Sequence, residues 1–290
     1  MASLAELKGN HPDIADDFTI PQRWENYGEA EHAIWRTLFD RQMAILPDRA
    51  AHEFLDGVGK LDLDQGRIPD FERMSETLFA LTGWRVVAVP SLVPDDVFFD
   101  HLAGRRFPAG QFIRRPEQLD YIEEPDVFHD VFGHVPMLAH PVFADYMQAY
   151  GKGGQRALAQ FGALKNLARL YWYTVEFGLI ATQAGLRIYG SGIASSNAES
   201  VYALENPSPN RIAFDLERVM RTEYRIDDFQ ETYFVIRSFD ELFAETYKDF
   251  AALYARLKEG PVHRPSDVAP GDVVLSRGTR AYRAGSHAAE

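Results

Sequence analysis

The chain has 290 residues, with 43 aspartates and glutamates against 30 lysines and arginines, a formal net charge of −13, and no cysteine. This acidic balance argues against a nucleic-acid partner, because binding to a polyphosphate depends on clustered cations. The lack of cysteine excludes disulfides, thiolate metal sites, iron–sulfur clusters and cysteine nucleophiles. Any metal ion must therefore be held by histidine, aspartate or glutamate.

The first twenty residues are polar and have no helical or strand period, so residues 1–20 are expected to form a flexible arm. They contain no basic region followed by an apolar core, which a secretory signal requires. No apolar stretch approaches the roughly 20 residues of a membrane helix. We expect a cytoplasmic protein without a membrane partner.

Hydrophobic periodicity predicts a mainly helical fold of the α+β class. The expected helices cover 29–46, 70–83, 95–103, 126–133, 141–150, 163–183, 196–204, 210–221 and 238–257. Short strands are expected at 85–89 and 233–236, with no βαβ alternation. No linker or repeat interrupts the pattern, so 21–258 is expected to be one compact helical domain. Past residue 258 the helical period stops, which predicts a tail over 259–290 that is either loosely packed or carries one small hairpin.

Two histidines five residues apart lie in the segment EPDVFHDVFGHVP, residues 124–136. On a regular α-helix His129 and His134 would lie about 140° apart and could not bind one ion together. Gly133 can adopt a left-handed conformation, and Pro136 disfavours a helical conformation at the residue before it. We therefore expect the helix to stop here and His134 to turn back toward His129. The alternative is that both are core histidines bonded to the backbone.

Glu176 is the only charged residue between Arg169 and Arg187, inside a segment that is apolar nearly all round. A buried carboxylate costs several kcal/mol unless it is paired or coordinates a metal. A long-range ion pair is one explanation, and a metal site with the two histidines is the other. Two imidazoles and one carboxylate suit non-haem Fe(II) or catalytic zinc. Iron is favoured because the H-E-x-x-H arrangement of many zinc enzymes is missing.

Three ordered motifs, PDVFHDVFGHVP, YWYTVEFGL and YGSGIASS, closely resemble those of the pterin-dependent aromatic amino acid hydroxylases, which act on phenylalanine, tyrosine or tryptophan. The similarity runs almost without gaps over 82–250 and more weakly back to Pro21. This resemblance implies a catalytic domain built around a non-haem iron site. It also implies that His129, His134 and Glu176 bind the Fe(II).

The resemblance assigns further residues to the pterin and to catalysis. Phe98 matches the aromatic residue that stacks on the pterin ring, although by itself it would be taken for a core residue. Tyr171 matches a position that faces both pterin and iron. Asp130 stands where the animal enzymes carry glutamate, so its shorter carboxylate would reach the pterin only in a shifted pose or through a water. The remaining pterin-binding positions are Leu92, Val93, Asp95 and Ala168.

The same resemblance assigns the substrate site. Arg114 matches the arginine that binds the amino-acid carboxylate, a task that suits its planar guanidinium. Ile122 replaces a threonine that assists this contact in the animal enzymes. Asp126 is expected either to orient the ring of His129 or only to cap a helix. The aromatic pocket and the serine near the first ligand histidine correspond to Trp172, Phe177 and Ser195.

The implied reaction is hydroxylation of the ring of a free aromatic amino acid, with O2 as oxidant and tetrahydropterin as the two-electron co-substrate. Phenylalanine is the favoured substrate, because the chain lacks the regulatory domain and tetramerisation helix of the animal enzymes, as bacterial phenylalanine hydroxylases do. Ile226 is apolar where the tyrosine enzyme carries an acid. We expect a monomeric phenylalanine 4-monooxygenase that depends on separate pterin-recycling enzymes. The alternatives are a tryptophan or tyrosine hydroxylase, a zinc hydrolase, and a non-catalytic amino-acid or pterin sensor.

Overall fold

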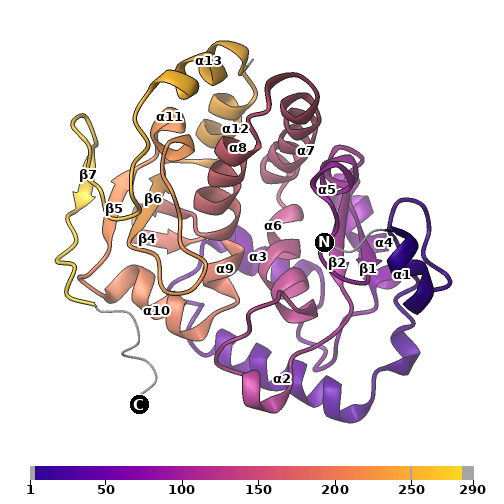
Figure 1. The fold of residues 1–290 in the computed structure, drawn as a ribbon. Helices are drawn as coiled ribbons and strands as arrows, with labels where there is room; N and C mark the ends of the chain where they lie inside the picture. Colours follow the sequence, from indigo (N-terminus) through magenta and orange to yellow (C-terminus); the bar gives the residue numbers. More distant parts are fainter. Residues whose placement is uncertain (1–3, 249, 283–290) are drawn as a thin grey trace.

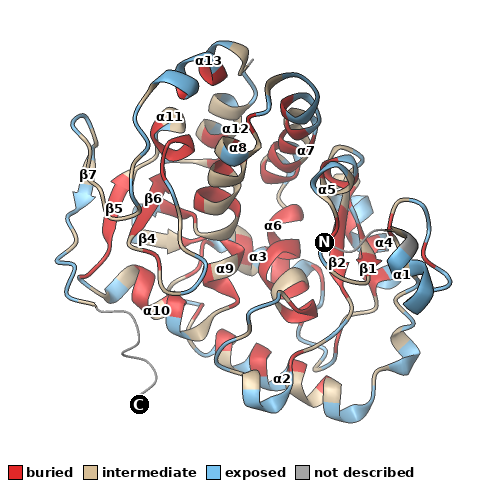
Figure 2. Ribbon diagram, in the orientation of Figure 1, coloured by how far each residue is buried: buried red, intermediate tan, exposed pale blue. Residues whose placement is uncertain are grey.

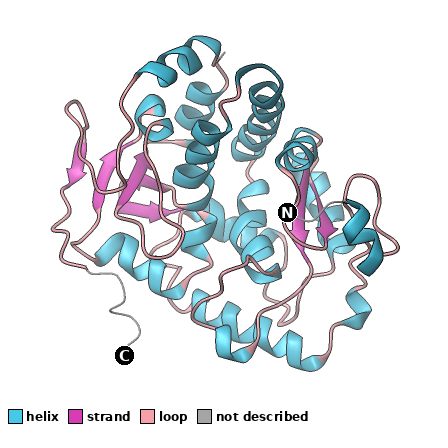
Figure 3. Ribbon diagram, in the orientation of Figure 1, coloured by secondary structure: helices cyan, strands magenta, loops and turns pink. Residues whose placement is uncertain are grey.

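A computed structural model describes residues 4–248 and 250–282, and helices dominate it (Figure 1; Figure 3). The α-helices are α1 (Leu4–Asn10), α2 (Glu29–Met43), α3 (His52–Lys60), α4 (Phe71–Thr82), α5 (Asp95–Ala103), α6 (Val135–Leu138), α7 (Pro141–Arg156), α8 (Leu164–Tyr171), α9 (Ser191–Ala194), α10 (Asn197–Glu205), α11 (Leu216–Met220), α12 (Phe239–Thr246) and α13 (Ala251–Glu259). The strands are β1 (Arg85–Val89), β2 (Arg106–Gly110), β3 (Leu179–Thr182), β4 (Gly185–Ile188), β5 (Asn210–Ala213), β6 (Thr232–Ile236) and β7 (Val274–Ser276). Wider π-helical turns occupy Phe128–His134, Ala157–Phe161 and Trp172–Glu176. The expected mainly helical class is confirmed. No helix in these described ranges has the length and hydropathy to cross a membrane.

A small parallel sheet pairs β1 with β2, from Arg85 opposite Arg106 to Val89 opposite Gly110. Helix α5 connects the two strands, so this part of the chain is a βαβ unit. The expectation that the chain has no such unit is therefore wrong. Strand β2 (RFPAG) was missed because proline and glycine replace the β-branched residues that usually indicate a strand.

The second sheet has the strand order β4-β3-β6-β5-β7, and every residue of β6 is buried. The expected helix over 210–221 is wrong at its start, because 210–213 forms β5 beside β6. Likewise the expected helix over 163–183 ends at Glu176, and its last residues form β3. In a short apolar run, the hydrophobic period cannot distinguish a buried strand from a helix. The last expected helix is divided into α12 and α13, and Ser238 caps the first of them as predicted.

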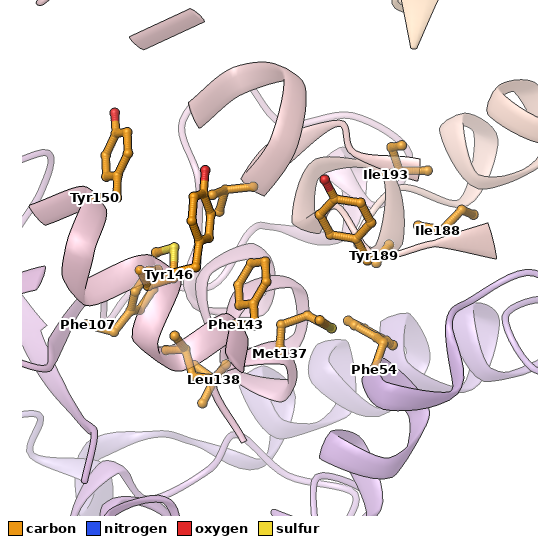
Figure 4. Close-up of a cluster of buried hydrophobic side chains, with 14 of the residues drawn as sticks. Phe54, Phe107, Met137, Leu138, Phe143, Tyr146, Tyr150, Ile188, Tyr189 and Ile193 are labelled. Carbon is orange, nitrogen blue, oxygen red and sulfur yellow. The ribbon is translucent and has the colours of Figure 1, made fainter. Parts of the chain in front are cut away.

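An aromatic core supports the π-helix Phe128–His134 from behind. Phe128 and Phe132 stack with their ring centres 4.8 Å apart, and Trp35 meets Phe128 edge-on at 5.2 Å. Phe54 meets Phe132 edge-on at 5.7 Å, and all four rings are buried. Figure 2 shows this burial running through the centre of the molecule, and Figure 4 shows how the core continues between Phe54 and the side chains of α6 and α7.

Both ends of the described chain contact the rest of the fold. Helix α1 lies in the segment that was expected to lack regular structure, and Ile14 and Phe18 beyond it are buried against Val89 and Val93. At the other end, β7 pairs with β5 within the segment expected to be a tail. The division into arm, domain and tail stays a prediction.

Glu199 on α10 is a buried acid, 5% exposed, that forms no ion pair within the described ranges. One of its oxygens, Oε1, accepts hydrogen bonds from the Tyr233 hydroxyl and from the backbone N–H of Gln230 at 3.3 Å. Burial raises the pKa of Glu199 to about 7. In an unfolded chain a glutamate has a pKa of about 4.3.

We expect the buried glutamate to make stability depend on pH. Because its folded-state pKa is raised, the stability it contributes is full below the unfolded pKa and is lost as the pH rises through about 7. Glu199→Gln removes this titration. As the pH rises from 5 to 8, the free energy of unfolding of the variant should therefore increase by about 2 kcal/mol relative to that of wild type. Urea unfolding at the two pH values measures the change. The exposed Glu117→Gln is the control, and a Glu199→Gln curve parallel to wild type would contradict the expectation.

Candidate active site

Three side chains from two helical segments converge near the centre of the molecule. The Nε2 atoms of His129 and His134 lie 3.3 Å apart. Glu176 Oε1 lies 3.2 Å from His134 Nε2, and Glu176 Oε2 lies 3.6 Å from His129 Nε2. Within the described ranges, these three form the only group of three or more His, Cys, Asp or Glu side chains with the spacing of a metal site. They are the three residues that the sequence predicted as ligands.

The reason that the two histidines meet differs from the predicted one. Residues Phe128–His134 form a π-helix, in which hydrogen bonds join residues five apart. This wider turn brings two histidines five residues apart closer to one face than an α-helix would. The helix does not stop at Gly133, because Val135 has helical backbone dihedral angles and α6 follows directly. Gly133 is needed for a different purpose, because a Cβ there would lie 2.9 Å from the Ser191 carbonyl oxygen.

Two serines set the orientation of the ligands. Ser195 Oγ donates to the Ser191 carbonyl at 2.8 Å, so at 2.9 Å from His129 Nδ1 it acts as the acceptor. His129 therefore carries its proton on Nδ1 and presents the lone pair of Nε2 to the metal position. The Ser191 hydroxyl donates to Glu176 Oε2 at 2.8 Å.

The charge states of the ligands follow from burial and from their proximity. Burial lowers the pKa of His129 to about 4, which keeps its imidazole neutral near pH 7. Burial alone would raise the pKa of Glu176, but His134, His129 and the Ser191 hydroxyl lower it to about 2. A neutral imidazole and an ionised carboxylate are the forms that bind a metal ion.

The residues fit a single metal ion. Bonds of about 2.1 Å from one ion to neighbouring ligands leave the donor atoms about 3.0–3.4 Å apart, for angles between octahedral and tetrahedral. The measured separations of 3.2, 3.3 and 3.6 Å are close to this range. All donors are nitrogen or oxygen, which suits iron and zinc alike, so geometry leaves the metal open.

Two neighbouring cavities meet beside these ligands. The first has a volume of about 270 Å³ and is bounded by all three metal ligands and by Phe107, whose ring centre lies 4.9 Å from that of His134. The second, of about 580 Å³, is lined by six aromatic side chains and by four charged ones, Asp95, Lys165, Arg169 and Glu223. The side chains that border both cavities are Asp95, Phe98 and Tyr171.

Comparison with known proteins identifies the family. Residues 9–259 match the family described as biopterin-dependent aromatic amino acid hydroxylase. The chain belongs to this family. The phenylalanine-4-hydroxylase of Caulobacter vibrioides is 64% identical over 274 residues, which cover 94% of this chain and 93% of that protein.

A solved structure of a second relative is also similar. The crystal structure of phenylalanine hydroxylase from Chromobacterium violaceum with iron and phenylalanine bound has a TM-score of 0.86 and 58% identity, covering 90% of this chain and 95% of that one. Membership in a hydroxylase family rules out the zinc hydrolase alternative.

The positions predicted for the pterin surround the first cavity of this hydroxylase. Leu92 and Val93, in the loop after β1, line it together with Asp95, Phe98 and Asp130, whereas Ala168 lines only the second cavity. The Phe98 ring lies edge-on to Tyr171 at 5.7 Å. Asp130 Oδ2 accepts from the Gly110 N–H at 2.8 Å, and burial raises the pKa of Asp130 to about 7.

Arg114 is buried and forms a bidentate ion pair with Asp126, which was not predicted from the sequence. Its Nε and Nη2 donate to the two oxygens of Asp126 at 2.8 and 2.9 Å, and its backbone N–H donates to Oδ2 at 2.9 Å. Asp126 also accepts from the backbone N–H of His129 at 3.0 Å. Asp126 therefore caps the helical segment, and the contact to the ring of His129 comes from Ser195 instead.

Two residues predicted for the aromatic pocket, Trp172 and Phe177, have their rings in contact. Trp172 lines the second cavity, where its ring stacks on Tyr224 at 4.3 Å and meets Phe177 at 4.8 Å. The structure adds Ser191, Phe107, Gly110 and Tyr224 to the surroundings of the site. The YGSGIASS motif includes Ser191 and so offered a signal, whereas strand β2 and Tyr224 gave none.

Proposed function

We propose that this protein is a phenylalanine 4-monooxygenase that converts L-phenylalanine to L-tyrosine. The observation that carries the proposal is the His129–His134–Glu176 group beside a largely apolar cavity, in a chain 64% identical to a phenylalanine-4-hydroxylase. When bound, iron with O2 and a tetrahydropterin supplies the oxidation of the aromatic ring. The three ligands lie on one side of the metal position, which leaves its other positions open.

The side chains of this protein bind and orient the two organic molecules. We assign the pterin to the first cavity, where Phe98 would stack on its ring and the loop at Leu92 and Val93 would bond its edge. Asp95 completes this binding site in the proposal, and Ala168 would contact the pterin from the adjoining second cavity. Asp130 has Oδ2 fixed by Gly110, which leaves Oδ1 as the atom available to a pterin N–H.

Tyr171, whose ring centre is 6.2 Å from that of His134, is assigned to keep water from the metal position. The amino acid is assigned to the side of Arg114, Trp172, Phe177 and Ser195. Asp126 occupies the Nε and Nη2 donors of Arg114, and the Leu119 carbonyl lies 3.5 Å from Nη1, so the second N–H of Nη1 is the one assigned to the substrate carboxylate.

Product analysis tests the function directly. The protein loaded anaerobically with Fe(II) should form tyrosine from phenylalanine only when both O2 and a tetrahydropterin are added. Competition among phenylalanine, tyrosine and tryptophan separates the three hydroxylase specificities, and zinc loading is the control. Ligand binding without product or oxygen uptake would indicate the non-catalytic sensor instead.

Replacing Arg114 with lysine tests the substrate site. A lysine keeps the charge but loses the planar fork, so we expect the KM for phenylalanine to rise about 10–100-fold with a smaller change in kcat. Arg115→Lys is the matched control, because Arg115 is exposed and its Nε donates to the Gln118 side chain. An unchanged KM in Arg114→Lys would remove Arg114 from the substrate site.

The monomeric state, the cytoplasmic location and the dependence on pterin-recycling enzymes stay predictions.

A further inference from the structure

A single hydrogen bond ties the indole of Trp172 to a loop far away in the sequence. Trp172 Nε1–H donates to the side-chain oxygen Oε1 of Gln230 at 2.9 Å. Gln230 is 2% exposed and lies two residues before β6, so its backbone is held at the start of the larger sheet. The indole is thus bonded to a rigid part of the fold.

The amide of Gln230 has one possible orientation. Its Nε2 donates to the backbone carbonyl of Arg225 at 3.0 Å and to that of Asp228 at 3.4 Å. Reversing the amide would place N–H groups against the indole N–H and oxygen against two carbonyls, which leaves every contact repulsive. The acceptor presented to Trp172 is therefore fixed by the loop itself.

The loop and the indole form one packed unit. Tyr224, at the start of the loop, stacks on Trp172 with an angle of 15° between the rings. At the other end, the backbone N–H of Gln230 donates to Glu199, which also accepts from Tyr233. Ring stacking alone would allow Trp172 to slide in its plane, whereas the hydrogen bond also sets its direction.

We propose that Gln230 is a positioning residue for hydroxylation, which acts by holding the indole of Trp172 against the bound amino acid. The inference rests on the proposed function, in which Trp172 is a wall of the substrate pocket. Trp172 is half-buried, and an indole N–H that loses its acceptor there is unfavourable, so the ring would turn to find another partner. The substrate ring would then lie less well aligned with the metal position. O2 would still oxidise the tetrahydropterin, with the two electrons reducing O2 to hydrogen peroxide, but less tyrosine would form.

The ratio of tyrosine formed to pterin oxidised measures this alignment. Gln230→Met, which keeps the length of the side chain but has no acceptor for the indole, should lower the ratio at least about threefold. Gln230→Glu keeps the oxygen that accepts from the indole but turns its second oxygen toward the Arg225 and Asp228 carbonyls, so it should recover only part of the wild-type ratio. Gln155→Leu removes an exposed amide that bonds Asp100 at 2.7 Å and serves as the control. A merely structural role would lower the folded fraction in both Gln230 variants and leave the ratio unchanged.

A double variant shows whether Gln230 acts through Trp172. Trp172→Phe removes the donor, so adding Gln230→Met to it should lower the ratio no further. If Gln230→Met does not fold, Trp172→Phe alone must show the lower ratio. Absence of tyrosine from the wild type would contradict the proposed function. A productive wild type with an unchanged ratio in Gln230→Met, or a further loss in the double variant, would overturn this inference alone.

Discussion

Glu176→Gln is expected to lose iron binding and to lower the rate of hydroxylation at least about 1,000-fold. The amide has nearly the shape of the carboxylate and can still accept from Ser191, so the fold around it should persist. As a metal ligand, however, the amide is neutral, and the two imidazoles are neutral as well. The centre would then have no anionic ligand to balance the charge of the ion.

Iron content after anaerobic loading and removal of free metal is the direct measurement. Glu205→Gln is a suitable control, since Glu205 is an exposed glutamate paired with Arg49. The control should retain one iron per chain and wild-type turnover. Retention of one iron by Glu176→Gln, with turnover near that of wild type, would show that Glu176 is not a ligand.

Asp126→Ala is expected to lower the free energy of unfolding by about 3–5 kcal/mol, because it leaves the buried guanidinium of Arg114 without its partner. Asp126 is fully buried and Arg114 is 6% exposed, so water cannot replace the lost carboxylate easily. The substitution also removes the acceptor for the backbone N–H of His129. Iron affinity should therefore fall together with stability.

A second variant separates the unpaired charge from lost packing. Arg114→Met combined with Asp126→Ala leaves no buried charge and should recover much of the stability, as measured by urea unfolding of both proteins. Equal stability of the single and double variants would contradict this explanation.

The pair should also respond to acid. Burial opposes ionisation of Asp126, but the Arg114 guanidinium outweighs it and holds the pKa of that carboxyl below its usual range. The stabilisation is therefore present at neutral pH and is lost as the pH falls through the folded-state pKa.

The metal ligands could be predicted because their chemistry is local and unusual. A lone glutamate in an apolar helix and two histidines near a glycine and a proline need an explanation wherever they fold. The path of the chain between them could not be predicted, since a π-helix and an α-helix are built from the same residue types. Hydrophobic periodicity also failed to identify short buried strands such as β5, whose pairing partners lie elsewhere in the sequence.

Polar contacts between residues far apart in the sequence could not be predicted either. Arg114 and Asp126 are separated by twelve residues and Trp172 and Gln230 by fifty-eight, so neither pair has a local pattern. The family resemblance indicated Arg114 as a substrate residue, but nothing in the sequence indicated that a buried aspartate would hold it in place. Such contacts follow from the packing of whole elements, which no window of neighbouring residues contains.

All three ligands lie on π-helical turns, the histidines on Phe128–His134 and the glutamate at the end of Trp172–Glu176. Such turns are rare, which indicates that they are weaker than α-helical ones and need tertiary support. An ion bound to both segments would act as a cross-link between two π-helical turns that are far apart in the sequence. Loading with metal should then slow the exchange of backbone amide hydrogens mostly in these two segments, and the rest of the helical framework should exchange as before.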